Sequence, residues 1–309
     1  MADVLNGLAN IEETSGDTYT FWDERQRITT PCQQDFYTVD IKYAGERKTQ
    51  YQSHDSKGMV VLIHGLESNS NSSLSTDMSR AYVEDGFDAV FINFRGQCGT
   101  PNDTLGGYHL GFTDDLRHFL KLMSELVEDN DDFEKRPIYL SGFSLGANVV
   151  VKCLGELGNA AMSLYNVQGA AVTGAPFDAE RNVKCLDAPG FNKAVYSDNV
   201  FESLKRRAQY ELDRFCDGDS CTTEFDYKGV MSAMTVQEYD NGFIAKIFGF
   251  KDCTDYYRQT SCYYFLPSVA VPLYILNAED DPFFDPGKSA VQYLCCAHFT
   301  SAVINFIMA

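Results

Sequence analysis

The sequence predicts an α/β protein with a mostly parallel central sheet, helices on both faces of the sheet, and a helical cap inserted between two strands. Short runs of apolar residues recur along the first half of the chain, and segments with apolar residues at helical spacing separate them. This alternation stops at about residue 175 and one more strand-like run follows residue 270. Alternating strands and helices form parallel sheets with helices on both faces.

Most of the expected strands are continuous apolar runs, which is typical of strands buried on both faces; the first one alternates instead. The strands are expected at residues 34–43, 59–63, 89–93, 137–140, 169–173, 272–276 and 301–308. Helices are expected between them at residues 73–86, 114–127 and 145–157, and a further helix at 201–215.

A chain of 309 residues is long enough for one domain that carries an insertion. We expect residues 1–174 to form the first part of the core, residues 175–265 the helical cap, and residues 266–309 the last part of the core. The interruption between two sheet strands predicts a cap above the carboxyl ends of the strands, where open α/β sheets bind their ligands.

Residues 142–146 read Gly-Phe-Ser-Leu-Gly and connect an expected strand to an expected helix. A Gly-x-Ser-x-Gly motif in this context predicts a nucleophile elbow, in which the serine stands on a sharp turn and the flanking residues must be small. The helix that follows directs backbone N–H groups toward any nearby anion. The sequence therefore indicates Ser144 as a nucleophile.

Composition narrows the function classes. The chain has 25 basic and 44 acidic residues and a net charge of −19, which argues against binding nucleic acid or an anionic membrane surface. No transmembrane segment and no signal peptide is evident, so the ten cysteines are expected to be reduced in a cytoplasmic protein. The cysteines show no metal-binding spacing, so neither a metal nor another cofactor is expected. The sequence does not indicate the oligomeric state.

Several motifs together resemble the α/β-hydrolases of the YheT-like, ABHD-type esterase family (AB hydrolase-4). The resemblance implies an α/β-hydrolase fold and a serine carboxylester hydrolase that acts through an acyl-enzyme on acylglycerols or on short- to medium-chain esters, with a small-molecule ester or lipid as its partner. The motifs are His-Gly-Leu-Glu-Ser at 64–68, Asn-Phe-Arg-Gly at 93–96, Tyr-His-Leu-Gly-Phe-Thr-Asp-Asp at 108–115, the elbow with Asn148, and Asp-Asp-Pro-Phe at 280–283.

Acyl transfer also requires an oxyanion hole and an acid that orients the base. The expected oxyanion donors are the N–H of Leu145, directly after the nucleophile, and the N–H of Leu66 in the loop after strand 59–63. The acid is expected just after strand 272–276, where Asp280 and Asp281 stand side by side; Asp281 fits better, and Asp280 is the alternative. Asp285 is expected to cap the next helix.

The sequence departs from the family pattern at the catalytic base. The Gly-Gly-His turn expected after the last strand is missing. Of the five histidines, only His298 follows the acid, and it precedes strand 301–308, at the end away from the catalytic edge. We therefore expect the sequence to end before the family's histidine, with His298 or His109 as the remaining candidates. The alternative function is a catalytically impaired or inactive protein of this fold that binds a small acyl or hydrophobic ligand.

Other family motifs are expected to have structural roles. His64 is expected to form structural hydrogen bonds rather than to act as the base. Arg95 is expected to pair with Asp114 or Asp115 in preference to substrate. The tyrosines at 256–257 and the aromatic residues at 263–265 are expected to pack in the core in preference to lining an acyl pocket.

Overall fold

The structure is a computed structural model that describes residues 21–129, 133–189, 198–215, 227–278, 281 and 303–306. Within these residues, eight strands form one sheet in the order β1-β2-β6-β5-β7-β8-β9-β10, and two short strands form a hairpin. The strands of the sheet from β6 to β10 are parallel, whereas β2 is antiparallel to both of its neighbours. The strands are β1 (Glu24–Thr29), β2 (Phe36–Lys42), β3 (Arg47–Thr49), β4 (Gln52–Ser53), β5 (Met59–Ile63), β6 (Asp88–Asn93), β7 (Ile138–Phe143), β8 (Val167–Thr173), β9 (Leu273–Leu276) and β10 (Val303–Phe306).

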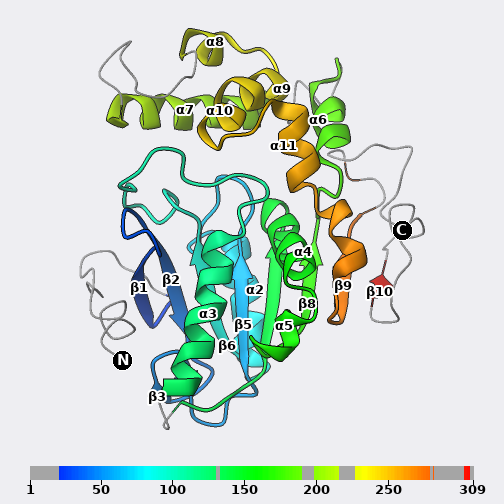
Figure 1. Cartoon of the computed structure of the whole chain (residues 1–309). Helices are drawn as coiled ribbons and strands as arrows, with labels where there is room; N and C mark the ends of the chain where they lie inside the picture. Colours follow the sequence, from blue (N-terminus) through cyan, green and yellow to red (C-terminus); the bar gives the residue numbers. More distant parts are fainter. Residues whose placement is uncertain are drawn as a thin grey trace.

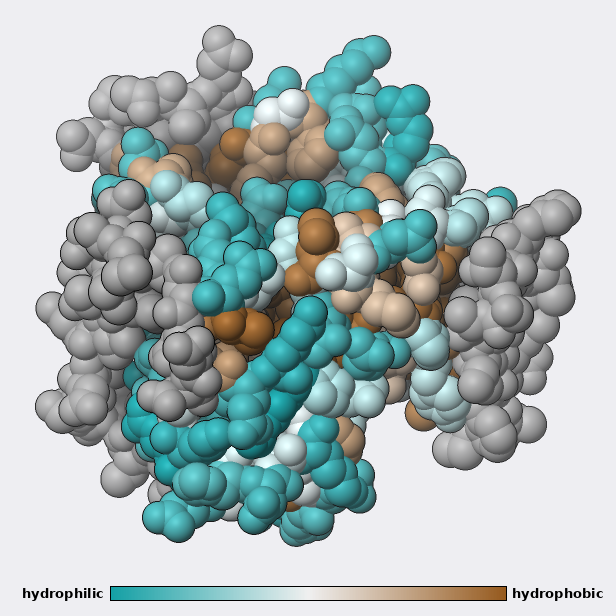
Figure 2. Space-filling view, turned by 60° about the horizontal axis from the view of Figure 1, so that its bottom comes forward, coloured by the Kyte–Doolittle hydropathy of each residue, from teal (hydrophilic) through white to brown (hydrophobic). Residues whose placement is uncertain are grey.

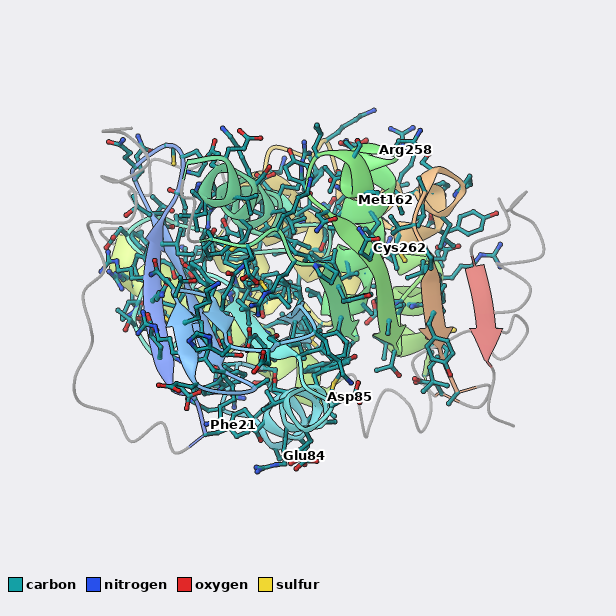
Figure 3. The ribbon with its side chains drawn as sticks, turned by 90° about the horizontal axis from the view of Figure 1, so that it is seen from below. Phe21, Glu84, Asp85, Met162, Arg258 and Cys262 are labelled. Atoms are coloured by element: carbon teal, nitrogen blue, oxygen red, sulfur yellow. The ribbon has the colours of Figure 1, made fainter. Side chains whose placement is uncertain are left out.

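Helices pack on both faces of the sheet (Figure 1). Seen from below, α2 with Glu84 and Asp85 lies on one side of the strands, whereas Met162 of α5 lies on the other (Figure 3). Fully buried strands such as β5 and β6 result from this double cover. The helices of these layers are α2 (Ser73–Glu84), α3 (Asp114–Asp129), α4 (Leu145–Leu157) and α5 (Ala160–Ser163).

A helical insertion, which we define as α6 to α11, separates β8 from β9 and lies across one end of the sheet (Figure 1). It has an apolar core of its own, which includes Phe201, Leu204 and Phe243. Leu66 and Leu110 of the core domain pack against both apolar clusters. The helices are α6 (Ala179–Asp187), α7 (Asp198–Phe215), α8 (Tyr227–Ser232), α9 (Val236–Tyr239), the π-helical turn η2 (Asp240–Ile244), α10 (Ala245–Ile247) and α11 (Cys253–Thr260), followed by the short helices η3 (Cys262–Tyr264) and η4 (Leu266–Ser268).

The predicted fold class is confirmed, and the expected strands and helices agree with the observed ones to within a few residues. Strand β1 was not predicted from the sequence, because its residues are mostly polar; it pairs with β2 over six residue pairs. Arg25 of β1 contacts Asp40 of β2 through two hydrogen bonds of 2.6 and 2.7 Å. The residue bounds expected for the core and the cap stay predictions.

The surface in Figure 2 is mostly hydrophilic, with apolar side chains showing in the middle of the view. Exposed apolar side chains are normal on the surface of a folded protein. None of the described helices combines the length and apolar character that crossing a bilayer requires.

Candidate functional site

Ser144 lies at the turn between β7 and α4 with φ 53° and ψ −124°, a left-handed conformation that non-glycine residues rarely adopt. It is exposed, whereas Leu145 and Gly146 after it are buried. A Cβ atom on Gly142 would stand 2.7 Å from the carbonyl oxygen of Gly146, and one on Gly146 would stand 2.3 Å from that of Ile63. Both glycines of the motif are therefore required by close backbone packing beneath the serine.

Two backbone amides lie close to this turn. Leu145 is the first residue of α4, so its N–H has no acceptor within the helix. Leu66 belongs to the turn after β5, and a Cβ on the preceding Gly65 would stand 3.1 Å from the Cβ of Ser144. The oxyanion donors expected from the sequence thus lie on segments that contact the serine or adjoin it.

A cavity of about 720 Å³ extends from the elbow to the helical insertion. Ser144, Leu66 and Leu145 line it together with Asp281, so the structure brings the expected nucleophile, amide donors and acid to one cavity. Asp280, Asp285 and His298 lie outside the described residues. Apolar side chains of the insertion line much of the remaining wall: Val183, Leu186, Leu204, Val236 and Ile244.

His64 is structural, as expected. Its ring is fully buried, Nδ1 donates to the carbonyl of Gly65 at 2.7 Å, and Nε2 accepts from the N–H of Phe94 at 3.0 Å. Burial lowers the pKa of His64 to about 4. The neutral imidazole therefore connects β5 and β6 and holds the turn that carries Leu66.

His109 also lines the cavity, within a cluster of aromatic rings that includes Phe248, 4.5 Å away between centroids. Its Nδ1 accepts a hydrogen bond from the N–H of Gly111 at 3.2 Å, so the proton of the neutral ring is on Nε2. Burial lowers the pKa of His109 to about 3. This tautomer and low basicity make His109 a structural residue rather than a general base.

Arg95 forms the expected pair with one of the two carboxylates in the first turn of α3. It contacts Asp115 through hydrogen bonds of 2.6, 3.0 and 3.2 Å, while its guanidinium lies 4.8 Å from the ring of Phe112. The sequence allows two roles for the tyrosines at 256–257, packing in the core and lining a pocket. Tyr256 and Tyr257 have both, because they are buried in the insertion and also line the cavity. The packing prediction is wrong for Tyr264, which is 55% exposed.

The sequence analysis missed Arg207 of α7, which lines the cavity. Its Nη2 donates to the carbonyl of Gly106 at 2.9 Å, and its guanidinium lies 4.0 Å from the ring of Tyr108. The sequence did contain a signal for Arg207. The apolar face of α7 runs through Leu204, Ala208 and Leu212, and Arg207 is a charged residue within that face.

Polar groups in the wall formed by the insertion were not predicted from the sequence either. Asp240 is buried and accepts a hydrogen bond of 2.7 Å from the hydroxyl of Tyr257. Burial raises the pKa of Asp240 to about 7. The amide nitrogen of Asn182, on α6, is buried and has no hydrogen-bond partner in the described part of the chain. In the part of the chain that the structure describes, no three His, Cys, Asp or Glu side chains form a group suited to a metal ion.

Comparison with known proteins gives a family match over most of the chain. The family model described as serine aminopeptidase, S33, matches residues 54–303. "Putative esterase YheT" of Escherichia coli is 32% identical over 260 residues, which cover 84% of this chain and 70% of that protein. Monoacylglycerol lipase of Saccharomyces cerevisiae is 26% identical and phospholipase ABHD3 of Mus musculus is 25% identical. The matches cover 82% and 75% of this chain but only 55% and 53% of those two proteins.

Solved structures share the fold at low sequence identity. The esterase Pf2001 of Pyrococcus furiosus superposes with a TM-score of 0.53 at 13% identity, over 96% of this chain and 86% of that one. At this identity the likeness concerns the arrangement of strands and helices alone.

Proposed function

Because the chain belongs to the serine aminopeptidase S33 family, among the YheT-like and ABHD-type esterases of the α/β-hydrolase superfamily, we propose that it hydrolyses short- to medium-chain esters or acylglycerols through an acyl-enzyme on Ser144. By family it is a serine hydrolase of carboxylic esters. The observation that supports the specific proposal most is the exposed, left-handed Ser144 at the base of a largely apolar cavity of about 720 Å³.

In the proposed reaction, the Ser144 hydroxyl attacks the ester carbonyl and the base takes its proton. The amides of Leu66 and Leu145 donate hydrogen bonds to the oxyanion, each worth on the order of 3 kcal/mol in the transition state. The C–O bond then breaks, the alcohol leaves with the proton from the base, and water hydrolyses the acyl-enzyme by the same steps. Asp281 would orient the base and stabilise its charged form.

The helical insertion, expected at residues 175–265, is proposed to act as a cap over the cavity, with the acyl chain among its apolar side chains. Val183, Leu186 and Val236 are the cavity residues that suit this contact. The names of the yeast and mouse relatives, a monoacylglycerol lipase and a phospholipase, support a lipid ester as substrate.

The base is the weakest part of the constellation, and it supports a second candidate function. His109 has the wrong tautomer, and Ser144 has no hydrogen bond to a histidine of the described residues. His298 is the proposed base. If no histidine reaches Ser144, the same cavity would serve a catalytically impaired protein that binds an acyl or hydrophobic ligand.

A fluorophosphonate probe distinguishes the two functions. An active enzyme is expected to be labelled, to hydrolyse short p-nitrophenyl esters, and to lose both properties in Ser144→Ala. Ser163→Ala, which alters an exposed serine on α5, is the matched control and should behave as the unaltered protein. Labelling that survives Ser144→Ala would refute the nucleophile, whereas no labelling and no hydrolysis by the unaltered chain would favour the binding function.

A further inference from the structure

Asn182, Asp240 and Tyr257 are polar residues of a cavity whose wall is mostly apolar. All three belong to the helical insertion, on α6, η2 and α11. None of them belongs to the proposed nucleophile, oxyanion donors or acid, so the reaction as described leaves them without a role.

Helix α6 is attached at both ends, which fixes Asn182 between the attachments. At its start, the N–H of Ala179 donates to the Ser261 hydroxyl at 3.0 Å. At its end, the Asp187 carboxylate accepts from the N–H groups of Val236 and Gln237 at 2.9 and 3.1 Å. The backbone of α6 that carries Asn182 is therefore held at both ends beside the cavity.

The Asn182 side chain has a hydrogen-bonding group that is not satisfied within the described residues. The residue is 7% exposed and its Nδ2 has no hydrogen-bond partner among the described residues, which is unfavourable for a buried amide. Asp240 can also accept a further hydrogen bond. Tyr257 donates only to Oδ2, and no described residue donates to Oδ1. One amide and one carboxyl group thus face a cavity that has room for a ligand.

The hydrogen-bonding chemistry of Asn182 and Asp240 indicates which kind of ligand group would bind between them. The Asn182 nitrogen needs an acceptor, and the Asp240 carboxylate needs a donor. A hydroxyl group supplies both, and it suits either orientation of the amide. A cation has no acceptor for Asn182, and the guanidinium of Arg207 lines the same cavity and would repel it.

We propose that Asn182 and Asp240 form a hydroxyl-binding subsite that selects esters carrying a free hydroxyl group away from the scissile bond. The proposal rests on the proposed function, since it assigns one end of the substrate to the cap and the carbonyl to Ser144. The hydroxyl belongs either to the alcohol part of the ester or to the far end of its acyl chain.

Binding measured in the full-length Ser144→Ala protein tests the subsite without requiring catalysis. Isothermal titration would compare three ligands: 2-hydroxyethyl decanoate with the hydroxyl on the alcohol, ethyl 10-hydroxydecanoate with it on the acyl chain, and ethyl decanoate with none. At least one hydroxyl ester is expected to bind about tenfold tighter than ethyl decanoate, as the net gain of one hydrogen bond would give. The tighter of the two identifies which end of the substrate contacts the cap.

Two variants and one control decide whether the preference comes from the subsite. Asn182→Leu has a similar shape, removes the unpaired amide, and is expected to abolish the preference while raising the melting temperature. Asp240→Asn keeps an acceptor for Tyr257 and is expected to weaken the preference. Asn159→Leu, on an exposed position before α5, should leave it unchanged.

Equal binding of all three esters would overturn the subsite, as would a preference that survives both Asn182→Leu and Asp240→Asn. These outcomes are separate from a failure of the proposed function, because the latter appears as absent fluorophosphonate labelling of the unaltered protein.

Discussion

The guanidinium Nη1 of Arg207 lies 3.7 Å from the carboxylate Oε1 of Glu67, the residue after the proposed oxyanion donor Leu66. Arg207 belongs to α7 of the insertion and Glu67 to the turn after β5, so the pair joins the two layers. Ser203 of α7 donates to the other carboxylate oxygen at 3.3 Å. The conformation of the turn beside Ser144 therefore depends on a helix that lies more than 130 positions later in the chain.

Arg207→Met is expected to disturb this turn. The variant removes the pair with Glu67 and the bond to Gly106, and it is expected to lower the free energy of unfolding by about 3 kcal/mol. Displacement of Leu66 should slow fluorophosphonate labelling of Ser144 by about 10- to 100-fold. Chemical denaturation and the labelling rate provide the two measurements.

Arg206→Met is the matched control, because Arg206 is the exposed neighbour on the same helix. It should change neither stability nor labelling appreciably. Slow labelling in both variants would mean that loss of positive charge, rather than loss of the contact with the turn, is responsible.

Asn148 joins the core to the end of the insertion. Its Nδ2 donates to the carbonyls of Leu110 and Thr260 at 3.0 and 2.8 Å, and its Oδ1 accepts from the N–H of Cys262 at 2.8 Å. Asn148→Leu leaves these buried groups unpaired and is expected to lower the free energy of unfolding by about 3 kcal/mol or more. Asn159→Ala, an exposed change without a capping bond to lose, should alter it by less than about 0.5 kcal/mol. Equal denaturation midpoints would contradict the joining role.

Much of the core could be predicted because its signals are local. All five residues of β5 are apolar and buried, and the elbow requires two glycines at fixed spacing around Ser144. Such features depend on backbone packing within a few residues, which a single sequence displays directly.

The contacts between the layers could not be predicted in the same way. The pair of Arg207 with Glu67 joins positions that come together only when α7 lies across the sheet. Asn182 and Asp240 are ordinary polar residues on short helices, and only their burial in one cavity distinguishes them. Long-range placement of this kind depends on the packing of the whole insertion.

Acid is expected to destabilise the fold partly through His64. Its pKa in the folded protein is about 4, below the ordinary 6.5, so the unfolded chain binds the proton first as pH falls. The contribution of neutral His64 to the free energy of unfolding is complete above about pH 6.5. It is lost as pH falls toward 4, and the loss is on the order of 3 kcal/mol in total. His64→Gln should be less stable at pH 7 and should show a flatter decline over this range. Urea denaturation at several pH values measures it.

His54→Gln is the control for that titration, because His54 is exposed. It should decline with pH as the unaltered protein does, since His64 is still present in this variant. A decline equally steep in His64→Gln would assign the acid sensitivity elsewhere.

Asp240→Asn is expected to stabilise the protein at alkaline pH. Burial raises the pKa of Asp240 from about 3.8 to about 7, so the folded protein holds this proton after the unfolded chain has released it. Ionisation of Asp240 therefore lowers the free energy of unfolding as pH rises from about 4 to 7, by on the order of 4 kcal/mol in total. The amide variant avoids this loss while its oxygen still accepts from Tyr257.

Urea denaturation at pH 8 and at pH 4.5 provides the measurement, with Asp77→Asn at an exposed position of α2 as the control. The gain of Asp240→Asn over the unaltered protein should be clear at pH 8 and small or absent at pH 4.5, whereas Asp77→Asn should show little gain at either pH. A gain of equal size at both pH values would contradict a buried, proton-holding carboxyl group. The buried Asp240 carboxylate lowers stability at neutral pH. A hydrogen bond from an ester hydroxyl at the subsite with Asn182 would offset part of that cost.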